Sequence, residues 1–126
     1  MNVLVVDTSS WISYFKGTAN EDLDLGLREG RVYLPPLVAA ELLSGKMRAG
    51  QQEQLEDFLR ELPFCKSDLD HWLRVGQLRR DLLAQGYSIS TPDAHVAQCA
   101  LDLTGYLMSV DSIFQKISEH IGLKLI

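Results

Sequence analysis

The sequence predicts an α/β fold in which helices flank a mainly parallel central sheet. Short apolar runs rich in Val, Ile and Leu alternate with helical segments, and Gly or Pro residues separate many of them. Strands that alternate with helices pair in parallel, and the connecting helices cover both faces of the sheet. No linker, repeat or low-complexity stretch divides the sequence, so we expect one domain over residues 1–126.

The first half of the chain is expected to begin with a buried strand at residues 2–6, because this apolar run is rich in Val. A helix over 9–15 follows and Gly17 ends it, and a second short helix covers 21–28. The further elements expected here are a strand at 31–34, a helix from the Pro35–Pro36 pair to residue 43, and a polar-faced helix at 51–62.

The second half is expected to be dominated by a long helix over 68–83, closed by Gly86. Thr91 and Pro92 then open a helix that runs to about residue 103, because Pro is favoured in the first helical turn. The further elements expected here are a short strand at 64–65, a strand at 106–110, a helix at 112–120 and a last strand at 123–126.

Composition and charge limit the classes of function. With 46% hydrophobic residues the chain can bury a core, which argues against disorder. The formal net charge of −5 argues against a basic nucleic-acid-binding surface. It does not exclude a nuclease, because divalent cations held by acids would face the phosphate. No apolar run is long enough for a transmembrane helix and no signal peptide is recognisable, so we expect a cytoplasmic protein without a membrane partner.

Four of the acidic residues stand out by their positions. Asp7 and Asp111 each directly follow an expected strand, Glu41 interrupts an otherwise apolar helix, and Asp93 opens a helix. Each has a structural alternative: Asp is a favoured N-cap, an acid in the first turn suits the helix dipole, and Glu41 could face solvent. Capping does not explain all four together. A shared divalent-metal site does, because Mg²⁺ and Mn²⁺ prefer carboxylate oxygens.

The same acids lie in an ordered set of sequence motifs. The motifs cover residues 5–9, 38–45, 86–100 and 107–114, and an apolar tail follows at 121–126. In the last motif Ser109 and Val110 precede the acid, and a Phe follows three residues later. In this order, over nearly the whole chain, the motifs resemble those of PIN-domain ribonucleases, in particular the VapC-type toxins of bacterial VapBC toxin–antitoxin pairs.

The resemblance implies a PIN-like three-layer sandwich and an endoribonuclease that acts as the toxin of a type II pair. The partners that it implies are an RNA substrate, a cognate antitoxin protein and a second copy in a homodimer. It implies that Mg²⁺ or Mn²⁺ is bound by four acids: Asp7, Glu41, Asp93 and Asp111. Ser9 and Ser109 would support these acids by hydrogen bonds. Many members carry a second acid where Ile113 stands, so one metal ion or two remain open.

Two further groups of side chains admit alternatives. Arg79 and Arg80, on the long helix, could contact an RNA phosphate or belong to a solvated helix face, which we favour. Trp11, Tyr14 and Phe15 form an apolar stripe, for which core packing is favoured over contact with an antitoxin or a second copy.

The histidines and cysteines predict no site. His95 is interpreted as a surface or packing residue, while His71 and His120 have no partner at ligand spacing. Cys65 and Cys99 match no zinc spacing and are expected to be small buried hydrophobes.

The alternative function is that of a PIN-like module that binds RNA or protein without catalytic activity. The presence of all four acids argues against it, and a cleavage assay with Mn²⁺ distinguishes the two functions. A phosphatase of the haloacid-dehalogenase type would need a second Asp at position 9, where Ser9 stands.

Overall fold

The computed structural model describes residues 2–126 as a four-stranded sheet flanked by helices. The strands are β1 (Leu4–Val6), β2 (Val32–Tyr33), β3 (Tyr106–Met108) and β4 (Lys124–Leu125). The helices are α1 (Thr8–Phe15), α2 (Glu21–Arg28), α3 (Pro36–Leu43), α4 (Ala49–Arg60), α5 (Leu69–Ala84), α6 (Thr91–Asp102) and α7 (Ser112–Ile121). The expected α/β fold is thereby confirmed, with helix ends that lie within two residues of the expected ones.

The sheet has the strand order β2-β1-β3-β4, and each neighbouring pair is parallel. β1 and β3 pair over their full lengths, with Val6 opposite Met108. The strand expected at 106–110 is shorter because β1 has already ended where residues 109–110 pass it. The strand expected at 64–65 is reduced to a single parallel bridge between Leu34 and Phe64.

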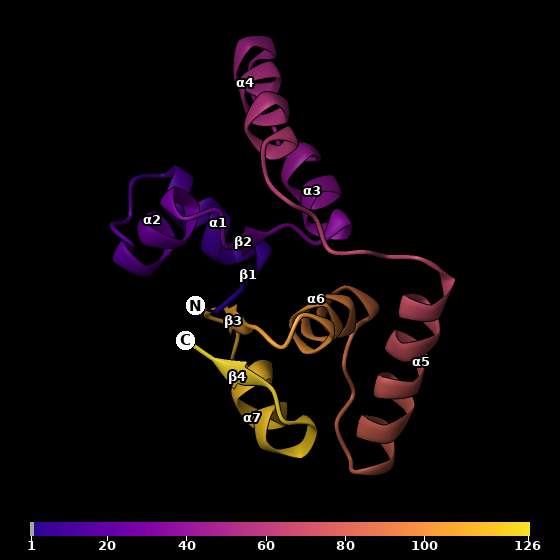
Figure 1. The fold of residues 1–126 in the computed structure, drawn as a ribbon. Helices are drawn as coiled ribbons and strands as arrows, with labels where there is room; N and C mark the ends of the chain where they lie inside the picture. The colour runs from indigo at the N-terminus through magenta and orange to yellow at the C-terminus, as the bar shows by residue number, and fades with distance from the viewer. Residues whose placement is uncertain (1) are drawn as a thin grey trace.

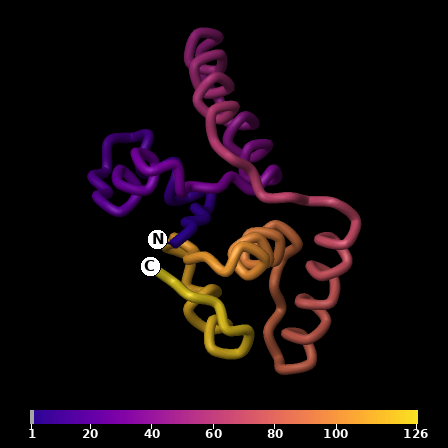
Figure 2. The backbone as a smooth tube through the Cα atoms, in the orientation of Figure 1, coloured from indigo at the N-terminus to yellow at the C-terminus, as the bar shows by residue number. Residues whose placement is uncertain are grey.

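The helices form layers on the two sides of this sheet. Figure 1 shows α1 and α2 on one side, and α6 with α5 beyond it on the other. α3 packs against α1 and α6, and α4 extends away from the rest of the molecule, which is also plain in the backbone trace of Figure 2. None of the helices within residues 2–126 is long and apolar enough to cross a membrane.

The core lies between the sheet and these layers. Val5, Val6 and Leu107 are fully buried, as expected for central strands that are covered on both faces. Trp11 is also fully buried, which confirms core packing for the start of its stripe. Phe15, one turn later, is 46% exposed, so the far end of α1 leaves the core.

Candidate functional site

The candidate site lies where β1 and β3 end side by side. The backbone N–H of Asp7 donates to the Met108 carbonyl at 2.9 Å, which extends the pairing of the two strands by one step. Parallel strands end at the same edge of a sheet, which is where binding sites of open α/β sheets lie. Asp7 and Asp111 follow β1 and β3, so both acids emerge at this edge.

Asp7 is the most enclosed acid of the group, with an exposed fraction of 8%. Its Oδ1 accepts a hydrogen bond from the Thr8 N–H at 2.8 Å, and its Oδ2 accepts one from the Ser109 hydroxyl at 2.9 Å. The Ser109 oxygen in turn accepts from the backbone N–H of Asp111 at 3.1 Å. Ser109 therefore joins Asp7 to the segment that carries Asp111.

Glu41 is exposed on α3 and is tied to α1 by a hydroxyl. Thr8 Oγ1 donates to Glu41 Oε1 at 2.7 Å. The structure thus gives Thr8 the supporting role on α1 for which Ser9 was predicted. Ser9 is exposed, and the hydrogen bonds found over residues 2–126 include none from its hydroxyl to an acid. The reason is helical geometry, because successive side chains point about 100° apart around the axis.

The capping alternatives hold for two of the acids. Asp7 and Asp111 are the N-caps of α1 and α7, and each accepts a backbone N–H at the start of its helix. Asp93 is not a cap, because that position belongs to Ser90, whose Oγ accepts from the Asp93 N–H at 3.2 Å. Capping and a metal site do not exclude each other, because each carboxylate has a second oxygen.

The four carboxylates lie close enough to repel one another. Burial is the main cause that raises the pKa of Asp7, and the charges of Glu41 and Asp111 raise it further. Two hydrogen bonds, from Ser109 and then Thr8, act in the opposite direction. Like charges that share a site favour a bound cation, and carboxylates with hydroxyl support are a fitting donor set for Mg²⁺ or Mn²⁺.

Asp93 couples to all three of the other acids. Burial is again the main cause that raises its pKa, and the charges of Asp7, Asp111 and Glu41 add to the effect, while a hydrogen bond with Ser90 opposes it. The ion pairs found within residues 2–126 bring no Lys or Arg to any of these four carboxylates. The group therefore has no counter-ion among the side chains that the structure describes.

Arg79 and Arg80 lie apart from the acids, on an exposed face of α5. Arg79 Nε donates to the Ile89 carbonyl at 2.9 Å, which anchors the side chain to the segment before α6. Both arginines line a hollow of about 270 Å³ that Ser88 also lines. This hollow belongs to the loop that leads to Asp93, so the arginines border the same segment without contacting the acids.

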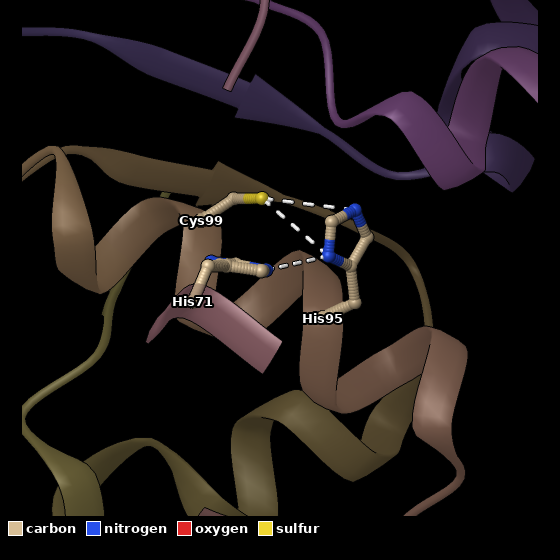
Figure 3. A group of neighbouring side chains, drawn as sticks. All are labelled: His71, His95 and Cys99. Carbon is tan, nitrogen blue, oxygen red and sulfur yellow. Dashed lines mark hydrogen bonds between the residues drawn. The ribbon is translucent and has the colours of Figure 1, made fainter. Parts of the chain in front are cut away.

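A second cluster lies between α5 and α6, and the sequence analysis missed it. His71, His95 and Cys99 are all buried, and Figure 3 shows their side chains turned toward one another. His71 Nε2 is 2.7 Å from His95 Nδ1, so the prediction that His71 has no partner at ligand spacing is wrong. The packing role predicted for His95 and the burial predicted for both cysteines are confirmed.

Two of the three residues of this cluster leave a signal in the sequence. His95 and Cys99 are four residues apart on one helix, which puts them on the same face. His71 comes from another helix, so its approach depends on how α5 packs on α6. Burial, and then the neighbouring His71, lower the pKa of His95 to about 4. The adjacent Cys65 thiol, and then burial, raise the pKa of Cys99.

Comparisons with known proteins identify the family. Among solved structures, the chain is similar to one in DNA-bound VapBC from Salmonella typhimurium, with a TM-score of 0.82, 19% identity, and 100% and 98% of the two chains covered. It is also similar to one in VapBC2 from Rickettsia felis bound to a promoter DNA fragment, with a TM-score of 0.77, 20% identity, and 98% and 97% covered. VapBC-5 from Mycobacterium tuberculosis gives a TM-score of 0.69, 20% identity, and 100% and 98% covered.

At these identities the structural likeness demonstrates a common fold. A comparison with curated proteins found no match. The family model of the PIN domain matches residues 4–120, which is nearly the whole chain. The chain therefore belongs to the PIN domain family.

Proposed function

We propose that this chain is a metal-dependent endoribonuclease that hydrolyses RNA phosphodiester bonds. The observation that carries the proposal is the gathering of four carboxylates near the edge where β1 and β3 end, where burial and then the charges of the other three raise the pKa of Asp93. Repulsion of this kind destabilises a fold, and a catalytic cation is the physical reason to retain it. Membership of the PIN family supports nuclease chemistry.

In this proposal, acidic residues bind the metal ions and hydroxyl groups hold the acids in position. The ligands of one or two Mg²⁺ or Mn²⁺ would be Asp7, Glu41, Asp93 and Asp111. A divalent cation bound there would supply a Lewis acid for the phosphate and lower the pKa of a water molecule. Ser109 fixes Asp7 and the start of the Asp111 segment, and Thr8 fixes Glu41, so that oxygens from three separate elements keep their positions. Such pre-orientation limits the reorganisation needed at reaction.

We further propose that the protein is the VapC-type toxin of a type II pair. A hollow of about 340 Å³ between the end of α1 and one side of α4 would receive the antitoxin. Phe15, Met47 and Phe58 line it, and Phe15 is 46% exposed. An apolar helix face is the kind of segment that fills such a groove. An arginine on the same antitoxin would suit the acids, because a guanidinium pairs with carboxylates bidentately.

The proposed homodimer would use α5. Leu69 and Leu73, one turn apart, are 72% and 61% exposed. Large apolar side chains that face solvent together are typical of interaction surfaces. Sedimentation of the purified protein tests this part by itself, and a monomer at all concentrations would refute it.

Cleavage of RNA by the purified protein tests the nuclease proposal. We expect cleavage of structured RNA with Mg²⁺ or Mn²⁺, none with EDTA, and recovery when the metal is restored. Asp7→Asn should lower the rate by at least about 100-fold, because it removes a charge from the proposed ligand set. Asp22→Asn, in the exposed first turn of α2, is the matched control and should cleave as the wild type does.

Two outcomes would count against the nuclease. Cleavage that persists after chelation and re-purification would refute metal dependence. RNA binding without cleavage under any of these metals would favour the module without catalytic activity. The toxin proposal has its own test in growing cells: expression should arrest growth, and Asp7→Asn should relieve the arrest. Equal toxicity of both proteins would point to a cause other than catalysis.

A further inference from the structure

We propose that the buried cluster between α5 and α6 is a second metal site, which binds Zn²⁺ through His71, His95 and Cys99, with Cys65 as the candidate fourth ligand. This site is separate from the four carboxylates and does not rest on the proposed nuclease function. Its donors are imidazole nitrogen and sulfur, which Zn²⁺ prefers, whereas the carboxylates suit Mg²⁺ or Mn²⁺.

The distances are close to those of a tetrahedral zinc site. The donor atoms of His71, His95 and Cys99 all lie within 4.8 Å of one another. His71 Nε2 is 2.7 Å from His95 Nδ1, and Cys99 Sγ is 3.9 Å from the same nitrogen. Zn–N and Zn–S bonds of about 2.0–2.3 Å would set the nitrogens about 3.3 Å apart and each about 3.5 Å from the sulfur. To complete the site, the two nitrogens would move apart by about 0.6 Å and the sulfur would approach the His71 nitrogen by up to about 1.3 Å.

Asp102 gives His71 the orientation of a metal ligand. Its Oδ2 lies 2.9 Å from His71 Nδ1, and a carboxylate can only accept, so Nδ1 carries the proton. In the tautomer with the proton on Nδ1, the ring lone pair is on Nε2, which points to the centre of the cluster. Metal-bound histidines typically donate their other N–H to a carboxylate in this way. Arg74 and Gln98 donate to Asp102 and hold it in place.

Cys65 is the candidate for the fourth position, because it is buried and its thiol lies beside that of Cys99. It is not among the three donors that lie within 4.8 Å of one another, so its side chain would have to move to bind the ion. Both cysteines line a cavity of about 330 Å³ that opens among Lys66, Asp68 and Arg74. This cavity provides an entry path, which a buried metal site requires. On the other side Trp72 stacks on the His95 ring at a centroid distance of 4.6 Å and shields it from water.

The site would link elements that are far apart in the sequence. Cys65 precedes α5, His71 lies on α5, and His95 and Cys99 lie on α6. A zinc ion bound by all four would fasten α6 to α5 and to the segment before it. Asp93, two residues before His95, is in the first turn of the same helix. The ion would thus stabilise the helix that carries one of the four carboxylates.

Without a metal ion, the same groups form a hydrogen-bonded chain from Cys99 through His95 and His71 to Asp102. This is the competing explanation, and spectroscopy with Co²⁺ separates the two. The protein is kept under a phosphine reductant, stripped with a chelator and titrated with Co²⁺. We expect one equivalent to give intense visible d–d bands and a thiolate-to-cobalt band in the near ultraviolet. Carboxylates alone give no thiolate band, so this band does not report Co²⁺ bound at the four carboxylates.

Variants locate the ion. Cys99→Ser should lose the thiolate band or most of its intensity, and Asp102→Asn should weaken the affinity for Co²⁺ by about 10–100-fold. His120→Gln changes an exposed histidine bonded to Tyr87 and should leave both the band and the affinity unchanged. Asp93→Asn should also keep the thiolate band, which separates this proposal from the nuclease.

Direct analysis provides a second measurement. After equilibration with Zn²⁺ and removal of the free ion, we expect about one Zn²⁺ per chain and a raised melting temperature. A folded wild type without a thiolate band at saturating Co²⁺ would overturn the proposal, as would an unchanged band in Cys99→Ser. If Cys99→Ser does not fold, Asp102→Asn decides: an unchanged affinity there would refute the role of His71 as a ligand.

Discussion

Asp7 serves two physical purposes with one side chain. One oxygen caps α1 through the Thr8 N–H, and the other accepts from Ser109. A cap needs only one acceptor, and many residue types provide it. The second bond, to a residue that follows β3, brings Asp7 into the group of acids. The preference for Asp at an N-cap therefore does not argue against a role of the same residue in the candidate site. Experiments must separate helix capping from that role.

Asp93→Asn separates them best, because Asp93 is not a cap. The change removes a charge from the first turn of α6, which costs about 0.3–1 kcal/mol of dipole interaction. It also relieves repulsion from three carboxylates, which in water is at most about 1 kcal/mol for each pair at about 4 Å and less at longer distances. We expect the variant without metal to be more stable by about 1 kcal/mol, to lose RNA cleavage, and to gain less stability than the wild type from Mn²⁺.

Thermal melts in EDTA and in Mn²⁺ measure both effects. Asp22→Asn is again the matched control, because Asp22 lies in the first turn of α2 and is exposed. It should lose only the dipole interaction and keep the full response to Mn²⁺. If Asp93→Asn behaves like Asp22→Asn, Asp93 is only a helix-start residue and is not a member of the site.

The raised pKa of Asp7 predicts a pH dependence of stability. Burial is the main cause of the increase, so the folded protein binds a proton on Asp7 more tightly than the unfolded chain does. The stability that this proton contributes is complete below the unfolded pKa, near 3.8, and is lost as the pH rises through the folded pKa. The Asp7→Asn variant has no titrating group at this position, so it does not show this loss of stability with rising pH.

Urea unfolding of wild type and Asp7→Asn in metal-free buffer, from about pH 4 to neutral pH, tests this. The stability of the variant relative to the wild type should grow with pH and then level off. Groups that do not interact with Asp7, such as Asp102, contribute equally to both proteins and cancel in this difference, whereas the coupled acid Asp93 responds to the loss of the Asp7 charge. Hydrogen bonds from Arg74, His71 and Gln98 outweigh burial and lower the pKa of Asp102. A difference that does not change with pH would mean that Asp7 titrates alike in both states.

At the scale of elements, the sequence predicts the sheet well because its signals are local. The runs at 2–6 and 106–110 contain enough Val, Leu and Met to identify buried strands, and an acid directly follows each. Parallel pairing then brings Asp7 and Asp111 to one edge without further information. Both acids of this part of the site could therefore be predicted from the chain alone.

What could not be predicted depends on the packing of one helix against another. The helix spacing of His95 and Cys99 is visible in the sequence, but it does not show that His71 comes within 2.7 Å. That Thr8 and not Ser9 bonds to an acid has the same origin. Which side chain of α1 reaches Glu41 depends on where α3 packs. Such details follow from tertiary contacts, which the hydrophobic periodicity of a sequence does not reveal.

The connection from α6 to β3 contains a close approach that only glycine allows. A Cβ at Gly105 would lie 2.7 Å from the Val3 carbonyl oxygen, which belongs to the backbone and cannot turn away. Gly105→Ala should therefore destabilise the fold by about 1–3 kcal/mol. Gly76→Ala is the matched control, because Gly76 is inside α5 and its added Cβ would meet nothing within 4 Å.

The control should stabilise the protein by about 0.5–1 kcal/mol, since Ala is the better helix former. Denaturant melts of both variants measure the two opposite changes. A Gly105→Ala protein as stable as the wild type would show that the chain near Val3 can shift to make room.

At the scale of the whole molecule, the net charge of −5 has a consequence for how RNA is bound. Each phosphate that a Lys or Arg neutralises adds about −0.7 to the slope of log affinity against log salt for a single strand. If Arg79 and Arg80 are the only such contacts, the slope should be about −1.4. A basic groove with many contacts would give a far steeper one. Most of the attraction would then come from the metal ion, and affinity would depend more on Mn²⁺ than on monovalent salt.

Binding of an RNA strand to Asp7→Asn, which permits equilibrium measurement without cleavage, tests this argument. Adding Arg79→Gln to that background should make the slope shallower by about 0.7, because one phosphate contact is lost. Arg28→Gln, on α2 at the other side of the sheet, is the matched control and should leave the slope unchanged. Equal slopes in all three proteins would mean that Arg79 belongs to a solvated face. The interaction with Ile89 would then be its whole role, because that hydrogen bond stabilises the turn into α6 whether or not RNA is present.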